Sequence, residues 1–168
     1  MRNSSVSLIR WLSVLLATAT LLVPSVTLAK QPKPFKATIA ISEVLEPKGG
    51  PPCFFLGHIS GTGHATDVGT VTVASLDCLN PDPLNTMVLW FSSHQVVLTA
   101  TNGDQLFATY GGTLTTQGAA GAISGGWQIT GGTGRFSQAT GQGVVQGLEN
   151  LSVSPAQGEV ELTGEIAY

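Results

Sequence analysis

Short β-type runs separated by turn residues constrain the fold of this chain more than any other feature. The runs are rich in Val, Thr, Ile, Leu and Phe, and after residue 30 no ten-residue segment has the 3.6-residue period of a helix. Eight runs can be counted, at residues 35–45, 54–64, 69–76, 86–99, 105–115, 122–130, 141–149 and 159–168. Because the links are short, the sequence predicts an all-β fold, an eight-stranded antiparallel β-barrel without open edges.

The last run shows the clearest alternation between apolar and charged side chains. One face carries Val160, Leu162, Ile166 and Tyr168, and the other carries Glu159, Glu161, Thr163 and Glu165. Period-two alternation is typical of a strand with one buried and one solvated face. Three carboxylates at this spacing could bind a cation, but we expect them to form a solvated outer face.

The first 29 residues have the pattern of a secretory signal peptide. Arg2 and Arg10 precede an apolar run at residues 11–23. Thr27 and Ala29 are small residues at the −3 and −1 positions before Lys30. The run of about 13 apolar residues is shorter than the roughly 20 that a spanning helix needs, which disfavours the alternative of a membrane anchor. We expect residues 1–29 to be removed and residues 30–168 to form a single secreted or periplasmic domain.

The charge distribution excludes one large class of partners. Residues 30–168 contain ten acidic and five basic residues, a net charge of −5, and Arg135 is the only Lys or Arg after Lys48. A nucleic-acid-binding protein needs a basic surface to neutralise phosphates, and this sequence has none. An anionic membrane surface is disfavoured for the same reason.

Two cysteines, Cys53 and Cys78, remain in the domain. In an exported protein such a pair predicts a disulfide, although two buried free thiols are an alternative. His58 and His64 lie near Cys53, but their spacing matches a zinc site poorly, so we expect no metal.

A glycine-rich stretch at residues 131–141, GGTGRFSQATG, could be taken for a phosphate-binding loop. A dinucleotide loop requires the spacing G-x-G-x-x-G at the start of a helix, and a P-loop requires Gly-Lys followed by Ser or Thr. Neither the spacing nor a following helix is present, and no Lys lies nearby. We therefore expect a structural turn without a nucleotide or other cofactor, with Phe136 as its buried anchor and with some glycines at positive φ.

The same stretch and the two residues after it, GGTGRFSQATGQG, resemble the motif of the allene oxide cyclase/dirigent-type barrels. The matching positions are Gly131, Gly132, Thr133, Gly134, Phe136, Ala139 and Gly141, and Arg135 matches the basic variant. Residues 61–72 and 99–112 resemble small secreted bacterial members, so that the resemblance spans about residues 35–168. It implies an eight-stranded antiparallel barrel with a cavity, often assembled as a homotrimer. In the plant members the cavity steers reactive lipid or phenoxy intermediates.

No residue pattern in the sequence indicates a catalytic centre. There is no G-x-S-x-G elbow, and the histidines lie in separate contexts. His64 is the best candidate for a general base, but we favour a hydrogen bond at a strand end. Arg135 could bind a ligand carboxylate, yet we favour an ion pair within the protein. Asp77, beside Cys78, stays unassigned. If a cavity exists, the ligand-binding candidates are His64, Trp90, Tyr110, Trp127 and Arg135.

Three functions remain open on the sequence. The favoured one is a non-catalytic exported barrel that binds a small apolar molecule or a partner protein. The second is an isomerase or cyclase that acts by confining its substrate, as the resemblance implies. The third, an outer-membrane barrel, is the weakest because the aromatic residues are too few for two girdles.

Overall fold

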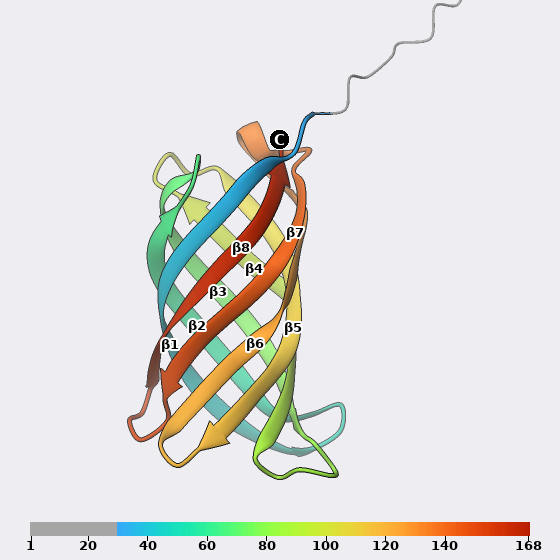
Figure 1. Ribbon diagram of the computed structural model, residues 1–168, viewed down its shortest axis with the longest axis vertical. Coiled ribbons are helices and arrows are strands. Elements are labelled where there is room, and N and C mark those ends of the chain that lie inside the picture. Colours follow the sequence, from blue (N-terminus) through green and yellow to red (C-terminus); the bar gives the residue numbers. More distant parts are fainter. Residues whose placement is uncertain (1–29) are drawn as a thin grey trace, which may run out of the picture.

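The computed structural model describes residues 30–168, so the predicted signal peptide lies outside the described residues. Eight strands follow one another along the chain (Figure 1). They are β1 (Lys33–Gly50), β2 (Cys53–Ala65), β3 (Gly69–Pro81), β4 (Val88–Ala100), β5 (Gln105–Gln117), β6 (Ala120–Gly132), β7 (Thr140–Asn150) and β8 (Ala156–Ala167). Each strand pairs antiparallel with the next, and β1 pairs with β8 to close the barrel.

The predicted all-β barrel is therefore confirmed, and each of the eight predicted runs corresponds to one strand. The strands extend beyond the hydrophobic runs, because backbone pairing continues where the side-chain pattern has ended. β1 reaches Gly50, which pairs with Cys53 across a tight turn, and β3 reaches Pro81. A hairpin at Asn102-Gly103 joins β4 to β5, with Gly103 at a φ of 88°.

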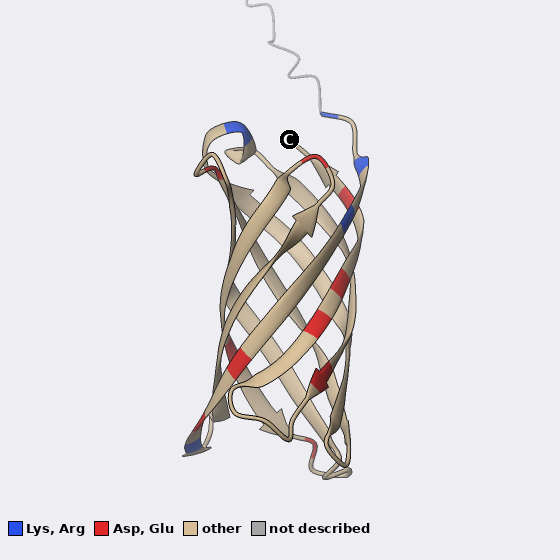
Figure 2. Cartoon of the chain, turned by 90° about the vertical axis from the view of Figure 1, so that its left-hand side faces the viewer, with Lys and Arg blue, Asp and Glu red and all other residues tan. Residues whose placement is uncertain are grey.

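The barrel wall separates an apolar interior from a largely polar outer surface. Alternate residues of each strand point inward, for example Phe35, Ile39 and Ile41 of β1, which are buried. The glutamates of β8 point outward as expected, and Glu161 forms a 2.9 Å ion pair with Lys36. In Figure 2 the acidic positions are spread along the wall, whereas Lys and Arg lie mainly near the two ends.

The glycine-rich stretch closes the barrel end at which both Lys33 and Tyr168 lie. It contains a single 3₁₀ turn, η1 (Gly134–Phe136), which is too short to have been expected from periodicity. Phe136 is fully buried, and its ring packs edge-on against Tyr168 at 4.8 Å between ring centroids. Gly134 has a φ of +53°, and a β-carbon there would overlap the Asp104 carboxylate. The predicted buried anchor, Phe136, and the predicted glycines at positive φ are thus present, and we call residues 131–141 the plug.

Arg135 holds this plug against neighbouring turns. Its backbone N–H donates to Asp104 Oδ2 at 3.5 Å, and Nε lies 3.9 Å from the same oxygen. Nη2 donates to the carbonyl of Val68 at 3.3 Å, and the guanidinium lies 4.6 Å from the centre of the Phe136 ring. The contacts of Arg135 are thus made within the protein.

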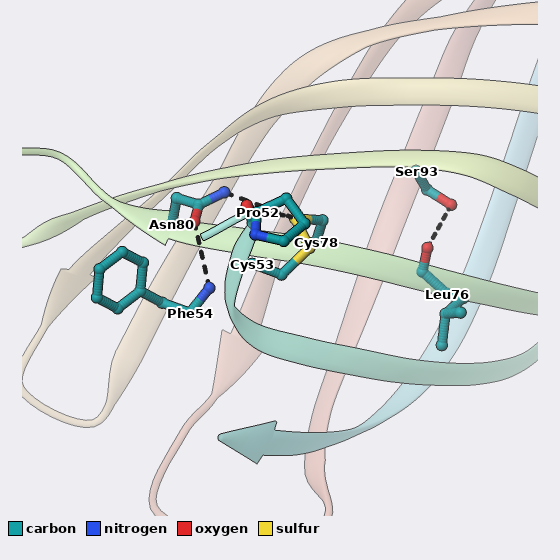
Figure 3. The surroundings of a disulfide bond; sticks show 7 residues. All are labelled: Pro52, Cys53, Phe54, Leu76, Cys78, Asn80 and Ser93. Atoms are coloured by element: carbon teal, nitrogen blue, oxygen red, sulfur yellow. Dashed lines mark hydrogen bonds between the residues drawn. A yellow bond between two sulfur atoms is a disulfide. The ribbon is translucent and has the colours of Figure 1, made fainter. Parts of the chain in front are cut away.

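Cys53 and Cys78 form a disulfide between the beginning of β2 and β3 (Figure 3). The side chain of Asn80 supports it: the Phe54 N–H donates to Asn80 Oδ1 at 3.2 Å, and Asn80 Nδ2 lies 3.6 Å from Cys78 Sγ. Cys78 faces the outside of the wall, whereas its neighbours Asp77 and Leu79 face the interior and are buried. The disulfide therefore fixes a segment of β3 that contributes to the barrel interior.

Candidate functional site

A cavity of about 90 Å³ lies inside the barrel. A single water needs roughly 10–15 Å³ on this scale, so the cavity can hold several waters or a small organic group. Most of its lining is apolar and aromatic, including Phe35, Ile39, Phe91, Trp127, Val145 and Leu162. Such a lining is typical of small-molecule sites, which combine apolar walls with a few polar groups.

One group of polar side chains in the cavity comes from three adjacent strands. Asp77 of β3 accepts hydrogen bonds from Ser75 Oγ at 2.5 Å and from the Tyr110 hydroxyl. Ser75 Oγ also lies 3.0 Å from Ser93 Oγ and 3.2 Å from the Tyr110 hydroxyl. Both oxygens of the Asp77 carboxylate therefore have donors.

An irregularity in strand pairing places these side chains together. The β3–β4 register shifts between Ser75 and Cys78, and the β4–β5 register shifts between Ser93 and Val96. Ser93, which is buried, donates to the carbonyl of Leu76 at 2.8 Å and accepts from the Gln95 N–H at 3.3 Å. Ser75 and Asp77 face inward by the ordinary alternation of β3, whereas the extra residue of β4 between Ser93 and Val96 lets both of these residues face inward.

Two glutamates lie inside the barrel and complete the cluster. Glu43 of β1 is only 5% exposed and Glu149 of β7 only 3%. Burial, followed by the nearby charges of Glu149 and Asp77, raises the pKa of Glu43 to about 8, and a hydrogen bond joins the two glutamate side chains. We call Glu43, Asp77 and Glu149, together with Ser75, Ser93 and Tyr110, the acid cluster.

Burial is the main cause of the other pKa shifts in the acid cluster. It raises the pKa of Glu149 and of Asp77, although the hydrogen bonds from Ser75, Tyr110 and Ser93 oppose the shift at Asp77. Burial and the Asp77 charge raise the pKa of Tyr110 well above its usual value. At neutral pH the cluster therefore contains a protonated Glu43, which can donate a hydrogen bond or a proton.

A glycine on β2 makes room for this arrangement. Gly57 pairs with Leu45 of β1 and Asp77 of β3. A β-carbon at Gly57 would overlap Glu43 Oε1 and approach Leu79 Cδ1 to 3.1 Å. The Glu43 side chain thus occupies a space that only glycine leaves open.

Of the five ligand-binding candidates from the sequence, two line the cavity and three do not. Tyr110 and Trp127 line the cavity, and Trp127 Nε1 donates to the carbonyl of Val144 at 3.0 Å. His64 is exposed on the outer face of β2, Trp90 is 53% exposed and donates to Asp82 at 3.0 Å, and Arg135 lies in the plug. A binding role for Tyr110 and Trp127 stays a prediction, whereas the other three do not line this cavity.

The sequence analysis missed Glu43, Glu149, Ser75 and Ser93, and left Asp77 unassigned. Glu43 could have been found from strand parity, because it follows Phe35, Ile39 and Ile41 at even spacing on the inward face of β1. No comparable signal precedes Glu149, because its neighbours on β7 include three glycines.

Among residues 30–168, no helix has the length and apolar character needed to cross a membrane. Within the same residues, no group of three or more His, Cys, Asp or Glu side chains is arranged to hold a metal ion.

The chain was compared with protein families, with curated proteins and with solved structures. No protein-family model matches the chain, and no curated protein matches it either. Among solved structures, the chain is similar to one described as the pterocarpan synthase dirigent protein GePTS1, with 15% sequence identity and a TM-score of 0.48. The match covers 84% of this chain and 88% of that one. Independently of these comparisons, the strand pairing of residues 30–168 shows a closed eight-stranded antiparallel barrel.

Proposed function

We propose that this protein is an exported barrel that binds one small, largely apolar molecule in its interior without changing it chemically. The acid cluster inside an otherwise apolar cavity is the observation that carries the proposal. Burying carboxyl groups costs free energy, which an apolar core of the same volume would not require. A polar group at one place in an apolar cavity instead gives a bound molecule a defined orientation.

The outer surface supports a barrel surrounded by water, and the disulfide supports the exported location. Ser, Thr, Gln and Glu alternate outward on several strands, as in Thr70 and Thr72 of β3 and Gln142 and Gln146 of β7. Although Val144 and Leu148 of β7 are also exposed, a largely polar outer wall around an apolar interior suits a barrel surrounded by water. It differs from a membrane barrel, whose outward band is apolar. The disulfide suits an oxidising compartment. The proposal therefore includes removal of residues 1–29 and a secreted or periplasmic domain at residues 30–168.

Native mass spectrometry of the protein purified from the extracytoplasmic fraction tests the proposal. We expect a mass that begins near Lys30 and a retained small molecule that leaves on denaturation. The same spectra give the mass of the assembly, and they test the homotrimer that the family resemblance implies.

A binding titration provides the second half of the test. In a Trp90→Phe variant, Trp127 is the remaining tryptophan of residues 30–168 and it lines the cavity, so its emission reports on cavity binding. We expect saturable changes with small aromatic compounds. Ala108→Leu should abolish them by filling the cavity, whereas Ala40→Leu, on the exposed face of β1, should not. The proposal would be overturned if the purified protein retained no ligand and also showed no saturable binding.

Confinement of a reactive substrate is the second candidate function, and the protonated Glu43 favours it. A neutral carboxylic acid in a dry cavity can protonate a bound intermediate, which an isomerase or cyclase requires. Chromatography of the retained molecule after incubation separates the two functions. Conversion that Glu43→Gln abolishes while binding persists would identify an enzyme.

A further inference from the structure

The side chains of the acid cluster indicate which polar group a ligand bound in the cavity should carry. We infer that the cavity selects a protonated organic amine, whose ammonium group binds the Glu149 carboxylate beside Glu43 and Asp77. This inference rests on the proposed ligand-binding function and names the class of ligand. It concerns recognition and requires no chemical step.

The open position in the cluster is a hydrogen-bond acceptor. Asp77 accepts from Ser75 and Tyr110, and the Ser93 hydroxyl donates to Leu76, so these groups have partners within the protein. Glu149 Oε1 is buried and accepts no hydrogen bond from a hydroxyl, amide or backbone donor, so that the Glu43 carboxyl is the one group of residues 30–168 that is hydrogen-bonded to Glu149. A buried acceptor without a donor destabilises the protein, and a ligand that supplies an N–H or O–H donor removes this penalty. Carbonyl and carboxylate ligands supply no donor.

Charge distinguishes an ammonium donor from a neutral one. The residues that line the cavity include Glu43, Asp77 and Glu149, and no Lys, Arg or His is among them. A cation at Glu149 is thus attracted by carboxyl groups from three strands, and in a buried site this attraction is weakly screened. The Phe91 and Tyr110 rings, 5.5 Å apart between centroids in an edge-on arrangement, line the same cavity and can also stabilise a cation.

Proton release provides an independent signature of this binding mode. The titratable groups that face Glu43 are Glu149 of β7, Asp77 of β3 and Tyr110 of β5. Without a cation, burial and the two acidic neighbours keep Glu43 protonated up to about pH 8. A bound cation favours the ionised form, so at neutral pH Glu43 loses a proton to solvent as the amine binds. The affinity for an amine should therefore rise with pH up to that pKa.

Calorimetry with three matched probes tests the inference: 2-phenylethylammonium, 2-phenylethanol and 3-phenylpropionate. Hydrogen bonds to charged groups exceed neutral ones by about one to two kcal/mol, so we expect the amine to bind about tenfold more tightly than the alcohol. The carboxylate should not bind. Titrations in buffers of different ionisation enthalpy should show proton release with the amine alone.

Matched variants locate the binding group. Glu149→Gln should remove the preference for the amine, whereas Glu159→Gln, a glutamate on the exposed outer face of β8, should leave it unchanged. Glu43→Gln should retain amine binding but abolish proton release. Thermal melts of all three variants establish that they are folded, and the proton release of the unmodified protein tests the inference without any variant.

Other binding results would contradict the inference. Equal binding of alcohol and amine, or tighter binding of the carboxylate, would overturn the inference while the proposed binding function stands. Displacement of the amine by Ca²⁺ at a similar concentration would mean that the cluster is a metal site, which also overturns it. If none of the probes binds and no small aromatic compound changes the Trp127 emission, both proposals fail.

Discussion

Glu43→Gln, which replaces a buried carboxyl group by an amide, should stabilise the protein at neutral pH. The pKa of Glu43 is raised from 4.5 to about 8, mainly by burial. Between these values the folded protein retains a proton that the unfolded chain releases. The free energy of unfolding therefore falls as pH rises through this window, and the stability contributed by the protonated group is complete only below about pH 4.5.

The magnitude follows from the size of the shift. One pKa unit corresponds to 1.36 kcal/mol, so at pH 7, about 2.5 units above the value of the unfolded chain, the Glu43 carboxyl costs about 3 kcal/mol. Gln has nearly the same shape, stays neutral at every pH and can donate a hydrogen bond to Glu149. We therefore expect the free energy of unfolding of Glu43→Gln to exceed that of the unmodified protein by about 3 kcal/mol at pH 7. Near pH 4.5 the two values should differ little.

Urea unfolding, followed by tryptophan fluorescence in buffers from about pH 4.5 to about pH 8.5, measures the effect. Stability of the unmodified protein should fall across the series, and the slope should be shallower in Glu43→Gln. Some slope should remain, because burial also raises the pKa of Glu149 and Asp77. Glu159→Gln, at an exposed position, should follow the unmodified protein. Parallel curves for Glu43→Gln and the unmodified protein would refute the assigned protonation state of Glu43.

Other predictions concern the plug and the disulfide. Phe136→Ala should cost about 3 kcal/mol or more of unfolding free energy in urea melts, since the ring is fully buried, and an unchanged melt would contradict its role as an anchor. Arg135→Gln should cost at most about 1 kcal/mol in the same melts, because its ion pair is partly exposed, and ATP or NAD should leave the melting temperature unchanged. Gly134→Ala should lower the melting temperature more than Arg135→Gln, because the residue has a positive φ and no space for a β-carbon. Non-reducing peptide mapping should find Cys53 linked to Cys78, and two free thiols after denaturation would contradict the disulfide.

The strand class and the strand count could be predicted from local sequence because they depend on short-range properties. The period-two pattern of β8 follows from Val160, Ile166 and the glutamates between them, whichever strands lie beside it. The role of the glycine-rich stretch could also be predicted, since the spacing around Gly134 is incompatible with a phosphate loop and Phe136 is the apolar residue available to anchor it.

The acid cluster could not be predicted from the sequence, because its members are far apart in the chain and come together only in the closed barrel. Glu43 and Glu149 are separated by 106 positions, and they meet only because β1 and β7 both pair with β8. The inward orientation of Ser93 depends on the register shift between β4 and its neighbours, which backbone pairing alone decides. Local sequence thus determined which faces of each strand are apolar, whereas barrel closure and strand register determined which polar side chains share the interior. The reason is that alternation is a property of one strand, and proximity across a barrel is a property of all eight.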